Sequence, residues 1–182
     1  MIKKLENVIK DGFTYLNPIY KNKEVENVNV LDVNSLYPSV MRCVRGELLP
    51  YGEPIYFEGK YKPDPIYPLY IQCIRCAFEV KKDMIPTIQI KDKRFFFTPN
   101  EYLESSNGEL VTLTLTNIDL DLFFKHYNIY DESYLGGWKF KGCNFLFNKY
   151  IDKWTDRKIE AGKAGNKGQR QLAKLMLNSL YR

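Results

Sequence analysis

The 182-residue sequence contains a single histidine, four cysteines and no apolar run near the roughly 20 residues that a membrane-spanning helix needs. Its first residues, Met1 to Asn7, carry charges without an apolar segment behind them, so no signal peptide is predicted and a cytosolic protein is expected. A hydrophobic content of 45% and an aromatic content of 15% exclude a disordered polyelectrolyte. The sequence also lacks internal repeats and low-complexity tracts.

The cysteines do not form the pattern of a zinc site. Cys73 and Cys76 make one C-x-x-C, but Cys43 and Cys143 are isolated, so no second pair completes a set of four ligands. The pair lies in an apolar stretch typical of a strand, on which positions three apart point to opposite faces. Buried or half-buried free thiols are therefore the favoured interpretation, ahead of zinc or a redox pair.

The positive charge is concentrated at the C-terminal end. The whole chain is formally +5, whereas residues 142–182 hold nine basic and three acidic side chains, or +6. The preceding 141 residues therefore sum to −1. A cationic end on a nearly neutral body indicates an anionic partner, with nucleic acid or nucleotide phosphate as the leading class.

Hydropathy patterns divide the chain into three stretches and predict an α+β fold. Residues 1–43 contain an apolar segment, Val28 to Val33, that predicts a short buried strand, followed by Asn34 and Ser35 as possible helix caps. Residues 44–141 look rich in strands and turns, with strands expected at 111–116 and around 134–140 and a short helix at 117–127. Residues 142–182 predict an αα-hairpin, two antiparallel helices joined by a glycine-containing basic turn.

The last predicted helix, residues 169–181, separates two faces by geometry alone. At 100° per residue, one side carries Leu172, Leu175, Met176, Ser179 and Leu180, which we expect to be the core stripe. The opposite side carries Lys167, Arg170, Lys174, Asn178 and Tyr181. A solvated basic face is the simpler interpretation. The order along this face, cations first and then an amide and a flat ring, also suits a helix that binds a nucleotide, with charges for the phosphates and a ring for the base.

A second candidate site lies at Asp32, where the predicted strand gives way to a turn. A carboxylate in this place can hold a hard cation such as Mg²⁺, and backbone N–H groups of the turn could meet phosphates bridged by the ion. Asp32 as a simple helix cap is at least as plausible on chemistry alone.

Two eight-residue strings carry a resemblance to a known family. Asp32 to Ser39, DVNSLYPS, resembles the palm motif D-x-x-S-L-Y-P-S of family B DNA polymerases, and Lys174 to Tyr181, KLMLNSLY, resembles their fingers motif K-x-x-x-N-S-x-Y-G. The intervening segments resemble the protein-primed subgroup of phage and linear-plasmid replicases: LPYG from Leu49, YPLYIQ from Tyr67, IPTIQIK from Ile85 and IDKWT from Ile151. In that subgroup an insertion, terminal-protein region one, separates the two motifs.

The resemblance implies a domain order and a set of roles. Residues 1–43 would be a palm segment, 44–141 the terminal-protein-region insertion, and 142–182 a truncated fingers hairpin. Asp32 would bind metal and act in catalysis, with the Val33 carbonyl on the second of two Mg²⁺ ions. The nucleotide-binding residues would be Ser35, Leu36, Tyr37, Lys158, Arg170, Lys174, Asn178 and Tyr181. Tyr37 would exclude a ribose 2′-hydroxyl by sterics, and Arg170 stands where the family more often has lysine.

The implied function is part of a protein-primed, template-directed DNA polymerase with Mg²⁺, dNTPs and template-primer DNA, encoded by a phage or plasmid and acting in the cytoplasm of a host. A priming terminal protein and a companion polymerase chain are possible partners. No Y-x-D-T-D-S motif with a second metal-binding carboxylate occurs in the sequence, so we expect the isolated chain to be inactive. The alternatives are a non-catalytic module that binds DNA or a priming protein, and a truncated gene product.

Three features are expected to be decoys. Asp119 and Asp121 form a D-x-D, but on a helix they would face about 200° apart, so first-turn residues facing the helix dipole are the better interpretation. His126 lies among aromatic residues and is expected to be structural. The segment from Gly162 to Gly168 lacks the G-K-[ST] order of a phosphate loop and predicts only the turn of the hairpin.

Overall fold

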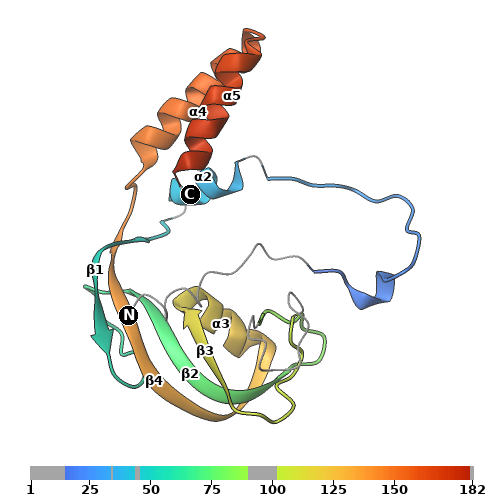
Figure 1. Cartoon of the computed structure of the whole chain (residues 1–182), viewed down its shortest axis with the longest axis vertical. Helices are drawn as coiled ribbons and strands as arrows, with labels where there is room; N and C mark the ends of the chain where they lie inside the picture. The colour runs from blue at the N-terminus through green and yellow to red at the C-terminus, as the bar shows by residue number, and fades with distance from the viewer. Residues whose placement is uncertain (1–14, 34, 44–45, 90–101, 181–182) are drawn as a thin grey trace. The chain divides into compact units, whose positions relative to one another are not determined.

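The computed structural model describes residues 15–33, 35–43, 46–89 and 102–180. The chain divides into two compact units, of which unit 1 comprises Met1–Tyr15 and Gly52–Lys141 and unit 2 comprises Leu16–Tyr51 and Gly142–Arg182. Figure 1 shows strands gathered in one unit and a pair of long helices in the other, a mixed α and β architecture as predicted. No helix within the described ranges is both long and apolar enough to cross a membrane.

Unit 1 holds most of a four-stranded sheet in the order β1-β4-β2-β3, from β1 (Leu49–Phe57), β2 (Leu69–Val80), β3 (Val111–Thr116) and β4 (Tyr127–Cys143). Strand β2 pairs antiparallel with both β3 and β4. The strict alternation from Val111 correctly predicted β3, whose odd positions are buried. The strand expected around 134–140 is confirmed, and it extends over 17 residues as β4.

Helix α3 (Asn117–His126) packs against β2 and β3 and closes the core of unit 1. The core contains Ile74, Phe78, Leu115, Phe123 and Tyr127, all 2% exposed or less. Thr116 is the N-cap: its Oγ1 accepts a bond from the Asp119 backbone N–H and donates one to the Asp119 carboxylate. This confirms the structural interpretation of Asp119 as a first-turn residue.

The cysteine pair is also structural. Cys73 and Cys76 lie on β2 as buried free thiols, as the sequence indicated. The Cys73 sulfur is 3.3 Å from the Thr114 hydroxyl, whereas Cys76 belongs to the core. His126 Nδ1 lies 2.9 Å from the Ile85 carbonyl oxygen, which is consistent with a structural histidine.

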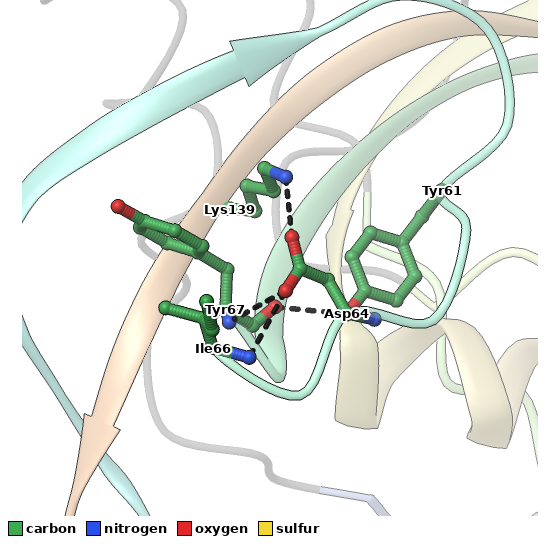
Figure 2. A network of polar contacts seen from close by, with 5 residues as sticks. All are labelled: Tyr61, Asp64, Ile66, Tyr67 and Lys139. Carbon is green, nitrogen blue, oxygen red and sulfur yellow. Dashed lines mark hydrogen bonds and ion pairs between the residues drawn. The ribbon is translucent and has the colours of Figure 1, made fainter.

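A polar network holds the connection between β1 and β2 (Figure 2). The Asp64 carboxylate accepts bonds from the backbone N–H groups of Ile66 and Tyr67 and pairs with Lys139 of β4 at 2.6 Å. The Tyr61 hydroxyl accepts a bond from the Asp64 backbone N–H and donates to the Tyr67 carbonyl at 2.8 Å. Because these bonds satisfy the backbone of a non-repetitive segment, the connection has one defined path across the sheet.

Unit 2 contains a 3-10 turn, η2 (Pro18–Tyr20), the short helix α2 (Leu36–Met41) and the predicted hairpin of α4 (Asn148–Lys163) and α5 (Lys167–Ser179). Asn166 caps α5 by accepting a bond from the Gln169 backbone N–H at 3.0 Å. Of the three glycines in the predicted turn, Gly165 has a φ of +67°, which a residue with a side chain rarely adopts. Gly162 and Gly168 instead lie inside the two helices.

The predicted core stripe of the last helix is wrong. The buried residues of α5 are Ala173 and Leu177, whereas Leu172 and Leu175 are 52% and 53% exposed. The apolar residues of α5 cover more than half of the helix circumference, so their spacing does not decide which part faces α4. Packing places the small Ala173 against the partner helix, and this turns Leu172 and Leu175 outward.

The predicted buried strand at Val28 to Val33 is also wrong. This segment is neither helix nor strand, and Val30 and Leu31 are 89% and 94% exposed. A strand needs a neighbour to satisfy its backbone N–H and C=O groups. None of the strand pairs formed by the described residues includes this segment.

Candidate functional site

Helix α2 presents the residues of the DVNSLYPS string. Ser35 stands at its N-cap with φ 55° and ψ 50°, a left-handed conformation, and Pro38 lies in the first turn, where its missing N–H is not needed. Pro38 is buried, whereas Leu36 and Tyr37 are 51% and 56% exposed. The neighbouring Asn34 lies outside the described residues. The predicted helix cap is therefore confirmed as the position of Ser35, although its side chain makes no capping bond.

The Ser35 hydroxyl instead bonds to helix α4. Lys158 Nζ donates to Ser35 Oγ at 2.9 Å, although the two residues lie 123 positions apart in the sequence. At the other end of α2, Arg42 pairs with Asp152 of α4, with Nε 2.5 Å from Oδ1 and Nη2 3.3 Å from Oδ2. The hydrogen bonds that Arg42 donates to Asp152, and the negative charge of that carboxylate, raise the pKa of the Arg42 guanidinium.

A pocket of about 810 Å³ lies within unit 2, bounded by α2, α4 and the first turn of α5. Its cationic lining residues are Arg42, Lys158 and Arg170, and its carboxylates are Asp152 and Asp156. Its apolar wall includes Pro38 and Ile151. The three cations outnumber the two carboxylates by one, so the pocket favours an anionic ligand.

The structure brings three of the predicted site residues together, since Ser35, Lys158 and Arg170 all line this pocket. Leu36, Tyr37, Lys174 and Asn178 are described but are not among its lining residues. Lys174 is exposed and Asn178 half-buried, one and two turns beyond Arg170 on α5. Tyr181 lies outside the described residues.

Sequence reasoning missed Arg42, Asp152 and Asp156. The two aspartates are among only three acidic residues in the basic stretch 142–182, and that contrast is the one signal that pointed to them. Nothing in the local pattern around Arg42 indicates a partner 110 residues away.

The proposed metal ligands Asp32 and Val33 lie on the exposed segment before α2. Within the ranges that the structure describes, no group of three or more His, Cys, Asp or Glu residues could hold a metal ion. A two-metal site needs more than one carboxylate. Asp32 therefore fits as one ligand of a larger set, and the described residues do not form a metal site by themselves.

Comparison with known proteins supports the motif resemblance. Residues 3–181 match the family model of DNA polymerase type B, organellar and viral. The chain is 52% identical over 179 residues to the DNA polymerase of Bacillus phage phi29, covering 98% of this chain and 30% of that protein. It is 37% identical over 158 residues to the DNA polymerase of Streptococcus phage Cp-1, covering 85% of this chain and 27% of the relative.

Solved structures agree with this assignment. The structure of phi29 DNA polymerase complexed with primer-template DNA and incoming nucleotide substrates matches with a TM-score of 0.88 at 52% identity, over 99% of this chain and 30% of that one. The complex of the same polymerase with single-stranded DNA matches with a TM-score of 0.86. The chain belongs to the organellar and viral type B DNA polymerases, and it spans about 30% of the length of the curated relatives it matches.

Proposed function

We propose that the chain is part of a template-directed, protein-primed DNA polymerase and that its unit 2 pocket receives the triphosphate of an incoming dNTP. The observation that carries this proposal is the convergence of Ser35, Lys158 and Arg170 on one pocket. Ser35 comes from the palm-like string, and the two cations come from the basic hairpin. A triphosphate would replace Ser35 as the partner of Lys158, because a charge-assisted bond to phosphate is stronger than a bond to a neutral hydroxyl.

The remaining predicted residues keep the roles implied by the family. Tyr37, on the exposed side of α2, is proposed to exclude a ribose 2′-hydroxyl, and Lys174 to add a second contact to the phosphates. Asn178 and Tyr181 are proposed to line the space of the nascent base pair. Leu36 is proposed to contact the sugar and triphosphate next to Tyr37.

Asp32 is proposed as one carboxylate ligand of Mg²⁺, with the Val33 carbonyl as a further ligand. The ion would supply charge stabilisation for the phosphates when the remaining ligands are present.

The domain roles are likewise proposals. Residues 1–43 are proposed as palm, 44–141 as the terminal-protein-region insertion and 142–182 as fingers. Template-primer DNA is the proposed macromolecular partner, and a priming terminal protein is proposed for the insertion. A companion polymerase segment would supply the second carboxylate, and the proposed location is the cytoplasm of a phage-infected or plasmid-bearing cell.

Binding of a fluorescent dATP analogue, followed by anisotropy, tests the proposal. Lys158→Gln and Arg170→Gln are each expected to weaken binding by roughly ten- to a hundred-fold, since a hydrogen bond to a charged group contributes about 1.5–3 kcal/mol. Arg157→Gln is the matched control, because Arg157 lies on α4, carries the same charge and packs over Trp154 outside the pocket.

The competing function is a non-catalytic module that binds DNA through the basic hairpin. Under that alternative, Arg157→Gln would weaken DNA binding as much as Lys158→Gln does, and the dATP analogue would not bind. Tyr37→Val separates the two further, since only the polymerase proposal expects it to reduce the preference for dATP over ATP.

A further inference from the structure

Two polar contacts fasten α2 to α4, one at each end of the short helix. Ser35 bonds to Lys158 at the start of α2, and Arg42 pairs with Asp152 just beyond its end. Ser35 and Arg42 are seven residues apart, and Lys158 and Asp152 are six apart. At 1.5 Å per helical residue these separations are about 10 Å and 9 Å. The two contacts therefore join α2 to α4 at points that are similarly spaced on both segments, with buried Pro38 between them on α2.

The two contacts differ in how readily a nucleotide can replace them. The Lys158–Ser35 contact is a single bond from a cation to a neutral hydroxyl, and a triphosphate competes for the same ammonium. The Arg42–Asp152 contact joins two opposite charges through two bonds, in the fork geometry that guanidinium and carboxylate share. The second contact therefore persists when the first one is exchanged.

We propose that Arg42 and Asp152 are positioning residues of the nucleotide pocket. Their ion pair holds α2 against α4 while Lys158 moves from Ser35 to the triphosphate, so that Tyr37 keeps its place beside the incoming sugar. This inference rests on the proposed function, because it assigns the exchange to nucleotide binding.

The charges around Arg42 and Asp152 allow two roles of Arg42 to be distinguished: holding α2 in position through Asp152, and attracting the phosphates directly. Asp156 lies one turn beyond Asp152 on α4, and Lys158 and Arg170 line the same pocket. If Arg42 acted mainly as a free cation for phosphate, removal of Asp152 would release it and tighten dATP binding. If the pair acts as a tether, loss of either partner weakens binding to a similar extent.

Cys43 supplies a readout that needs no nucleotide. It follows Arg42 directly, is a free thiol and is fully buried. A loosened α2 exposes it to a thiol reagent, and the labelling rate rises with the open fraction. Cys73 in unit 1, also buried, serves as an internal control that loss of the tether does not affect.

The experiment compares wild type, Arg42→Gln, Asp152→Ala, the exchanged pair Arg42→Asp with Asp152→Arg, and the control Arg157→Gln. Each protein is titrated with the dATP analogue, and Cys43 and Cys73 labelling is followed by mass spectrometry with and without dATP. We expect both single variants to bind about two- to five-fold more weakly, the range that an ion pair of this exposure supports. We expect faster Cys43 labelling in both, most of all with dATP, unchanged Cys73 labelling and partial recovery in the exchanged pair.

Three results would overturn the inference. One is tighter dATP binding by Asp152→Ala, which would make Arg42 a phosphate ligand. Another is that both single variants bind dATP and label at Cys43 as wild type does, while Lys158→Gln still weakens binding. The proposed function would then stand, and only the positioning role of the Arg42–Asp152 pair would fail. The third is a wild-type chain that binds no dATP, in which case the proposed function and the inference fail together.

Discussion

Gln72→Leu is expected to destabilise unit 1, although it keeps the side-chain volume. Gln72 is 1% exposed, and its amide oxygen accepts a 2.9 Å bond from the Tyr61 backbone N–H. Its amide nitrogen donates to the carbonyl oxygens of Gly59 and Gly136, both at 2.9 Å, and is 3.1 Å from that of Cys73. The side chain thus joins the β1–β2 connection to β4, next to a register shift between Cys73 and Ile74.

The magnitude follows from the groups that leucine leaves without partners. An unsatisfied buried polar group costs about 1–3 kcal/mol, and water can reach the half-buried Tyr61 and Gly59 more easily than the buried Gly136. With the full penalty for the Gly136 carbonyl and a partial one for each of the Tyr61 and Gly59 groups, we expect unit 1 to lose about 2–4 kcal/mol of stability.

Urea unfolding followed by tryptophan fluorescence measures this loss. Trp138 lies in β4 and is 5% exposed, so it reports on unit 1 once Trp154 of unit 2 is replaced by phenylalanine. Gln171→Leu, at an exposed position of α5, is the control and is expected to change stability by less than about 0.5 kcal/mol. A Gln72→Leu protein within about 1 kcal/mol of its parent would refute the reasoning, because it would show that water replaces all of these bonds.

Two further predictions concern unit 1. The Lys139 ammonium, and after it the Ile66 N–H group, lower the pKa of the Asp64 carboxyl in the folded protein. The ionised carboxylate therefore stabilises the fold above the pKa of the unfolded chain, near 4, and this stabilisation is lost as the pH falls through the lower pKa of the folded state. Urea unfolding should therefore show Asp64→Asn less stable than wild type at pH 7, with the difference vanishing at strongly acidic pH; a difference independent of pH would contradict the ion pair. Burial raises the pKa of the Cys76 thiol to about 11, so iodoacetamide at pH 8 should label it far more slowly than the half-buried Cys143, and equal rates would contradict its place in the core.

Local patterns predicted many of the elements. The alternation from Val111, the first-turn place of Asp119 and the helical pattern of residues 142–182 all depend on interactions within one or two turns or between adjacent residues. Such interactions can be read directly from spacing. The string that begins at Asp32 located Ser35, and the family resemblance indicated Lys158 and Arg170, before the pocket that joins the three residues was known.

The errors arose where the outcome depends on a distant neighbour. Val28 to Val33 has the composition of a buried strand, but a strand forms only where another strand pairs with it. The apolar residues of α5 are too widely spread to define a single face, so contact with α4 decided that Ala173 is buried and Leu172 exposed.

The sequence by itself determined the family, the elements of the hairpin and the concentration of nine basic residues in its last 41. These properties follow from residue identity, spacing and charge, which need no knowledge of the fold. Only the tertiary structure decided that Lys158 bonds to Ser35 and that Arg42 pairs with Asp152, across 123 and 110 residues of sequence. Contacts between residues so far apart form because packed helices bring their side chains together. No periodicity in the intervening sequence predicts such a contact.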